Sequence, residues 1–199
     1  MLALFFPVMA FAKTAEEYSN QGVVYAQGGN DALAIIDFTK AIEINPKFAE
    51  AYYNRALAYD RQGNYAYALA DYARAIEINP KDAEIYNNRG IAYHNQGDFV
   101  KAISDLTAAI QIDPGYTAAY NNRGLVYVKQ NKFTYAIADY TRAIQINPKF
   151  AEAYYNRGLA YYTIKEYAKA WVDVHEAEKL GLSVDPDFMI SLKEALGNR

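Results

Sequence analysis

Residues 49–82 read AEAYYNRALAYDRQGNYAYALADYARAIEINPKD, and residues 83–116 follow the same pattern as AEIYNNRGIAYHNQGDFVKAISDLTAAIQIDPGY. Proline recurs at the same step along the chain, since Pro46, Pro80, Pro114 and Pro148 are each separated by 34 residues. A period of 34 is typical of a helix-turn-helix unit, which buries too little apolar surface to fold alone and therefore stacks on its neighbours. The sequence predicts a tandem array.

The repeat register divides the chain into five units, 15–48, 49–82, 83–116, 117–150 and 151–184, followed by a tail, 185–199. Positions within a unit are counted below from its first residue. Tyrosine stands at position four and again at position eleven of every unit: Tyr18, Tyr52, Tyr86, Tyr120 and Tyr154, then Tyr25, Tyr59, Tyr93, Tyr127 and Tyr161. Position eight is always Gly or Ala, and positions twenty and twenty-seven are always Ala. The small residues favour close helix packing in every unit.

Each unit reads as two amphipathic helices, because large apolar and small residues recur at spacings of three and four. Between the helices stand Gly29, Gly63, Gly97 and Asn131, residue types that tolerate a left-handed turn, whereas the fifth unit has Lys165, which predicts mild strain. The second helix is expected to stop before each proline, since proline disfavours helical geometry in the residue that precedes it.

The pattern of aromatic, small, Tyr, Ala, large apolar, Ala and Pro resembles the tetratricopeptide repeat family over residues 15–184. The resemblance implies an all-α protein, a right-handed helix-turn-helix solenoid of five units. Two departures stand out. Position seven, Leu in the family, is Gln21 and then Arg in the other units, and Leu182 replaces the proline of the fifth unit, where the array is expected to end.

Position seven should meet position twenty-three across each pair of antiparallel helices, so every Arg there faces an Asp. We interpret these residues as structural ion pairs, because an unpaired charge in a helix seam is costly, although a ladder of carboxylates that binds a ligand is the alternative. The expected pairs are Arg55 with Asp71, Arg89 with Asp105, Arg123 with Asp139 and Arg157 with Asp173. Asp37 faces Gln21 and lacks such an arginine.

Positions two, five, six, nine, twelve and thirteen form one stripe on the first helix, and in the family this stripe lines the concave groove that binds peptides. Asn at position six of every unit suits hydrogen bonding to a ligand backbone, and equally a bond between repeats. The candidate groove residues are Tyr53, Asn54, Leu57, Asn87, Asn88, Ile91, His94, Asn121, Asn122, Leu125, Tyr155, Asn156, Leu159 and Tyr162. Position two is Glu16, Glu50, Glu84, Ala118 and Glu152, which disfavours an acidic ligand tail.

Composition narrows the function classes further. The net charge is −3 without a Lys or Arg cluster, which argues against nucleic acid as the main partner. With no Cys and only two His, far apart in sequence, the chain offers no thiol nucleophile, no Cys/His metal site and no obvious catalytic triad. We therefore expect no enzymatic activity, no cofactor and no metal.

The two ends differ from the array. Residues 1–12 are apolar and finish in Ala10-Phe11-Ala12, which predicts a signal peptide, truncated at its start, and hence a periplasmic or secreted protein with its mature chain from 13. An uncleaved apolar cap on a cytoplasmic protein is the alternative. Residues 185–199 begin with Asp185-Pro186 and carry Phe188, Leu192 and Leu196, which predicts a capping helix for the last repeat.

These observations predict a protein-protein interaction module, monomeric or weakly self-associating, whose groove holds a peptide or helix of a partner of unknown identity. One alternative is a scaffold that assembles through its convex face or its ends. A second is the regulatory array of an enzyme on another chain. No segment of the expected mature chain approaches the roughly 20 apolar residues that a transmembrane helix needs.

Overall fold

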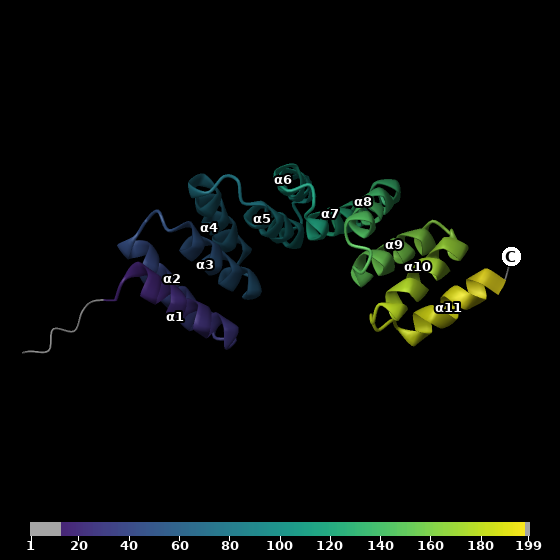
Figure 1. The fold of residues 1–199 in the computed structure, drawn as a ribbon, viewed down its shortest axis with the longest axis horizontal. Helices are drawn as coiled ribbons and strands as arrows, with labels where there is room; N and C mark the ends of the chain where they lie inside the picture. Colours follow the sequence, from purple (N-terminus) through teal and green to yellow (C-terminus); the bar gives the residue numbers. More distant parts are fainter. Residues whose placement is uncertain (1–12, 198–199) are drawn as a thin grey trace, which may run out of the picture. The chain divides into compact units, whose positions relative to one another are not determined.

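The structure is a computed structural model that describes residues 13–197. The predicted signal segment, 1–12, lies outside the described residues. Within 13–197 the chain forms eleven helices and no strand, so the predicted all-α class is confirmed. Consecutive helices pack against each other as hairpins (Figure 1).

Every unit of the sequence register contains one pair of helices. The first helices are α1 (Ala15–Gln27), α3 (Ala49–Arg61), α5 (Ala83–Gln96), α7 (Thr117–Lys129) and α9 (Ala151–Thr163). The second helices are α2 (Asp31–Ile44), α4 (Tyr65–Ile78), α6 (Phe99–Ile112), α8 (Phe133–Ile146) and α10 (Tyr167–Lys179). The tail forms α11 (Pro186–Gly197).

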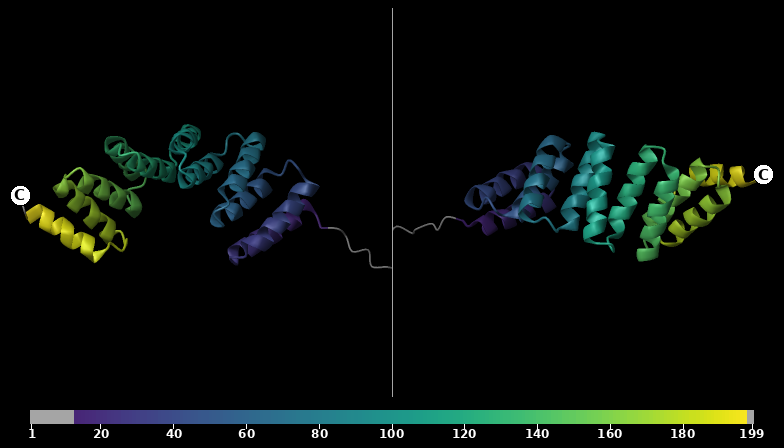
Figure 2. Two further views of the ribbon diagram at one scale, coloured as in Figure 1. Left: turned by 180° about the vertical axis from the view of Figure 1, so that it is seen from behind. Right: turned by 90° about the horizontal axis from the view of Figure 1, so that it is seen from above.

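The chain divides into two compact parts between Asn79 and Pro80, called here the first unit and the second unit. The five 34-residue segments of the sequence register are called repeats from here on. The first unit holds the hairpins α1/α2 and α3/α4. The second holds α5/α6, α7/α8 and α9/α10 together with α11 (Figure 2).

The turn inside each hairpin adopts the left-handed conformation that its sequence predicts. The φ angles are +75° at Gly29, +73° at Gly63 and +90° at Gly97, and also +58° at Asn131 and +65° at Lys165. Lys165 therefore carries the backbone cost that a side chain pays in this region, as the sequence indicated. In the first four repeats the second helix ends just before the proline. The residue that precedes the proline already has non-helical backbone angles: Asn45, Asn79, Asp113 and Asn147.

The core follows the small positions of the repeat. The alanines at positions twenty and twenty-seven are fully buried in all five hairpins, and so is the large residue at position twenty-four: Phe38, Tyr72, Leu106, Tyr140 and Val174. Small residues at position eight make room for that large side chain. A Cβ on Gly124 would lie only 2.5 Å from the Tyr140 ring, so α7 and α8 approach each other closely there.

Helix α11 closes the end of the second unit. Leu192 has no exposed surface and packs with Val174, Ala170 and Val184, while Phe188 and Met189 lie against the same cluster. Ile190, on the opposite side of α11, is 57% exposed. The helix therefore turns an apolar face to the last repeat and leaves the other face to solvent.

Candidate functional site

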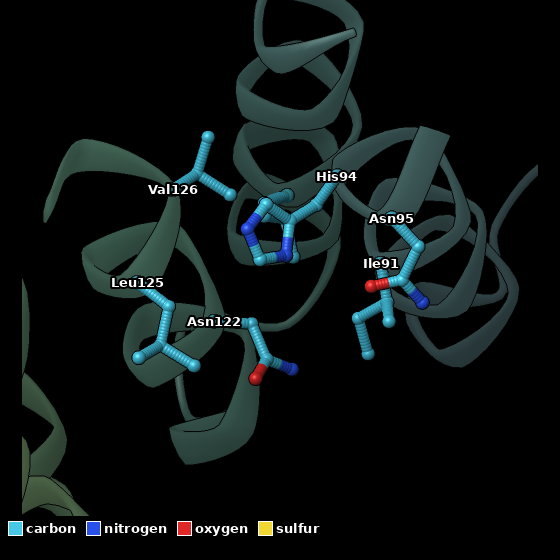
Figure 3. Close-up of a pocket in the computed structure, with 7 residues that line it drawn as sticks. Ile91, His94, Asn95, Asn122, Leu125 and Val126 are labelled. Carbon is cyan, nitrogen blue, oxygen red and sulfur yellow. The ribbon is translucent and has the colours of Figure 1, made fainter. Parts of the chain in front are cut away.

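The candidate site is the face of the first helices that carries the stripe of predicted groove residues. In the second unit this face is hollowed between α5 and α7 by a pocket of about 250 Å³, called here the α5–α7 pocket (Figure 3). Its lining consists of Ile91, His94, Asn95, Leu106, Asn122, Leu125 and Val126. Ile91, His94, Asn122 and Leu125 were predicted groove residues, so the fold gathers four of them around one cavity.

His94 lies in the middle of the α5–α7 pocket (Figure 3). Its ring centroid is 5.8 Å from that of Phe99, at an interplanar angle of 42°. Burial lowers the pKa of His94, and the charge of Lys129 lowers it further. The imidazole is therefore neutral at pH 7, which suits a pocket with largely aliphatic walls.

Asparagines on the same face bind one another across repeats. Asn122 Nδ2 donates to Asn87 Oδ1 at 2.9 Å, and Asn156 Nδ2 donates to Asn121 Oδ1 at 2.9 Å. Asn87 also donates to Asn88 Oδ1 at 3.1 Å. Asn87 and Asn121 are only 3% and 7% exposed, so these two predicted groove residues lie beneath the surface and join neighbouring hairpins. The sequence left two interpretations of these asparagines, hydrogen bonding to a ligand and a bond between repeats. The bond between repeats is present both between α5 and α7 and between α7 and α9.

At the last repeat the chain covers its own candidate face. The Phe188 ring of α11 lies 5.2 Å from the Tyr162 ring and 6.3 Å from the Tyr155 ring, both in edge-to-face geometry. Tyr155 and Tyr162 are therefore packed against α11, and both remain partly exposed, as does Leu159 on the same helix.

The first unit has a hollow of about 270 Å³ between α1 and α3. Asn54 and Leu57 line it together with Val23, Ala26, Gln27 and Arg61. Arg61 is held by Asp31, with Nε 2.9 Å from Oδ1. Tyr53, the remaining predicted residue of this unit, places its ring 6.2 Å from that of Tyr72.

The structure brings the predicted ion pairs together within the hairpins. Each guanidinium donates through Nε and Nη2 to the two oxygens of its aspartate at 2.7–2.8 Å: Arg55 to Asp71, Arg89 to Asp105, Arg123 to Asp139 and Arg157 to Asp173. All four aspartates are buried. The geometry is that of the structural interpretation, since both carboxylate oxygens are already engaged. Asp37 is instead 3.6 Å from Lys40 Nζ.

A threonine contact was missed by the sequence analysis. Arg55, Arg123 and Arg157 each donate through Nη1 to a threonine of the preceding hairpin, at 2.9–3.0 Å: Thr39, Thr107 and Thr141 respectively. The recurrence of Thr at position twenty-five was the available signal. Also missed were Asn95, Leu106 and Val126 in the pocket lining, of which Asn95 lies on the predicted stripe at position thirteen.

Within residues 13–197, no group of three or more His, Asp or Glu side chains is placed to hold a metal ion. No helix in the same range is both long and apolar enough to cross a membrane.

No curated protein matches this chain significantly. Solved structures with a similar fold do match it. A crystal structure of MamA is 26% identical, covers 80% of this chain and 93% of its own, and has a TM-score of 0.73. PilW, a widely conserved type IV pilus biogenesis factor, is 22% identical over 92% of this chain and 86% of its own, with a TM-score of 0.81. YrrB, described as a TPR protein with an unusual peptide-binding site, is 20% identical over 90% and 91%, with a TM-score of 0.69.

Two family models match the sequence. The model described as TPR repeat matches residues 22–63 and 124–165, and the model described as Tetratricopeptide repeat matches residues 53–117. Together they span more than half of the chain. The chain belongs to the tetratricopeptide repeat family.

Proposed function

We propose that this protein is a non-enzymatic interaction module that holds a peptide segment or a helix of a partner protein against the face formed by its first helices. The observation that carries the proposal is the α5–α7 pocket, an apolar hollow with amide groups at its edge on the expected binding face. Pockets of this composition bury an apolar side chain of a ligand while polar groups fix its orientation.

The family and the fold support the same proposal. Stacked helical repeats present extended surfaces that are used for binding. YrrB, which has a similar fold, is described as having a peptide-binding site, and we extend that kind of role to this chain. The glutamates at position two favour a ligand that is neutral or basic near them, since an acidic segment would be repelled.

We propose in addition that the protein acts in the cell envelope or outside the cell. The support for this is the apolar stretch 2–9 followed by Ala10-Phe11-Ala12, a signal-peptidase pattern. N-terminal sequencing of the protein from its native cells is the measurement. A chain beginning at Lys13 in the exported fraction is expected, whereas an intact Met1 in the cytoplasm contradicts export.

The binding proposal is tested with residues 13–199 as bait in an extract of the source-cell envelope, followed by calorimetry with the purified partner. Leu125→Glu places a charge in the pocket wall, and Val100→Glu, at a residue that is 76% exposed on α6, is the matched control. We expect the parent and Val100→Glu to bind the partner with equal affinity, and Leu125→Glu to lose it. Loss with Val100→Glu alone, or capture of the bait only by itself, contradicts the proposal and favours a scaffold that assembles through other surfaces.

A further inference from the structure

The third and fifth repeats place a ring contact at the same two repeat positions. In the third repeat, His94 at position twelve lies 5.8 Å from Phe99 at position seventeen, at 42°. In the fifth repeat, Tyr162 at position twelve lies 5.4 Å from Tyr167 at position seventeen, at 55°. Both hairpins therefore place a tilted pair of rings at these two repeat positions.

The two repeats differ in what lies over that ring. In the fifth repeat the following helix, α11, adds a third ring, because Phe188 packs edge-to-face on Tyr162 at 5.2 Å and 72°. In the third repeat the following helix, α7, places Asn122 and Leu125 beside His94, and the α5–α7 pocket remains open there (Figure 3). The hollow thus lies next to His94. At the same repeat position in the fifth repeat stands Tyr162, on which Phe188 packs.

We propose that the α5–α7 pocket binds one aromatic side chain of the partner, whose ring packs on His94 as Phe188 packs on Tyr162. This inference rests on the proposed function for the source of the side chain, and it names the chemical class that the pocket selects. It does not require α7 to move, since the pocket is already open.

The lining suits a ring better than a chain of methylene groups. Ile91, Leu125 and Val126 supply aliphatic walls, and the uncharged His94 ring offers an aromatic partner, for which edge-to-face or offset geometry adds to the effect of buried area. The Asn95 and Asn122 side chains reach the same space and provide amide groups for the backbone that carries the ring (Figure 3).

The test uses small probes and does not depend on knowing the partner. N-acetylphenylalanine amide, N-acetylleucine amide and N-acetylglycine amide are titrated into the protein, and the His94 ring and the Leu125 and Val126 methyl signals are followed by NMR. We expect saturable shifts with the phenylalanine compound, which binds about threefold to tenfold more tightly than the leucine compound. Equal affinity for these two compounds, or shifts no larger than with the glycine compound, would overturn the proposal.

Four variants locate the binding. Leu125→Phe fills the pocket and is expected to abolish the shifts at His94, whereas Val100→Phe, at an exposed residue of α6, is expected to leave them unchanged. His94→Tyr reproduces the residue of the fifth repeat and should retain the preference for the phenylalanine compound. His94→Leu should lose that preference while the protein remains helical by circular dichroism. Full binding to Leu125→Phe, or an unchanged preference in His94→Leu, contradicts the proposal.

The outcome is separable from that of the proposed function. If a partner is captured and lost with Leu125→Glu while the probes show no preference for the phenylalanine compound, the interaction module stands and the aromatic site is overturned. If the probes bind as expected and no partner depends on the face, the site stands and the proposed function fails.

Discussion

At the scale of single residues, a buried aspartate paired with an arginine recurs in four of the five hairpins. Each pair allows a charged aspartate to be buried between the two helices of its hairpin. Both oxygens of Asp105 accept from Arg89, at 2.7 and 2.8 Å, and the aspartate is only 6% exposed. A buried charge that loses its partner is far more costly than a pair replaced by apolar groups.

Replacing Arg89 alone should therefore destabilise the protein more than replacing the pair. Arg89→Leu is expected to lower the free energy of unfolding by about 3–5 kcal/mol, because Asp105 is left buried and uncompensated, while Arg89→Leu with Asp105→Leu recovers most of the loss. Urea unfolding of both variants measures the difference. A double variant of unchanged stability that no longer binds its partner would instead assign the pairs to ligand binding.

A second residue-scale prediction concerns Asp60 on α3. Its Oδ1 atom is buried without a hydrogen-bond partner, and burial raises the pKa of its carboxyl group. A raised folded-state pKa means that the folded protein favours the protonated acid, so the charge costs stability at pH 7 and the cost vanishes below the unfolded pKa of about 3.9.

Asp60→Asn is accordingly expected to raise the melting temperature at pH 7, by an amount that shrinks as the pH falls towards 4. Melting curves of parent and variant across this range provide the measurement. Asp31→Asn, which removes the carboxylate that pairs with the exposed Arg61, is the control and should not gain stability at pH 7. A gain that is independent of pH would show that ionisation of Asp60 is not its cause.

At the scale of single elements, α11 stands out because its contact with the array depends on few side chains. Leu192 is completely buried, whereas Ile190, two residues earlier, is 57% exposed. Truncating the first should loosen the helix, and truncating the second should not.

We expect Leu192→Ala to lower the free energy of unfolding by about 2–5 kcal/mol, since it opens a cavity against Val174 and Val184. Ile190→Ala should change it by less than about 0.5 kcal/mol, as is usual for exposed sites. Chemical unfolding of both variants compares them. Equal effects would mean that α11 does not pack on the last repeat as described.

At the scale of the whole molecule, stability in a repeat array is a sum of hairpins and of their contacts with neighbours. The ends of such an array have a neighbour on one side only. In the first unit this is visible at position ten of the repeat, where Val24 is 59% exposed while Ala58, in the hairpin that follows, is completely buried.

Amide hydrogen exchange should therefore vary along the second unit. The hairpin α7/α8 lies between α5/α6 and α9/α10 and is expected to exchange most slowly, while α11, which packs on α10, exchanges fastest. Mass spectrometry of peptides from each helix measures the order. Uniform protection across α5 to α11 would indicate that the unit opens as one cooperative block.

The sequence by itself determined the helical hairpins, their register and their turns, because these depend on local chemistry repeated five times. Each left-handed turn, each stop at a proline turn and each small residue at a helix contact is specified within one 34-residue repeat. The arginine and aspartate pairs were predictable for the same reason, since antiparallel helices in a hairpin fix which positions meet.

The tertiary structure alone decided which residues of the predicted face remain available to a ligand. Repetition makes Asn87, Asn121, Tyr155 and Tyr162 look equivalent to the other groove positions, yet the two asparagines are buried by bonds between hairpins and the two tyrosines pack against Phe188. The physical reason is that exposure depends on the neighbouring hairpin, whose asparagine bonds join residues 35 positions apart in the sequence, and on α11, which follows the last repeat. Periodicity identifies the face, and packing between repeats selects the pocket within it.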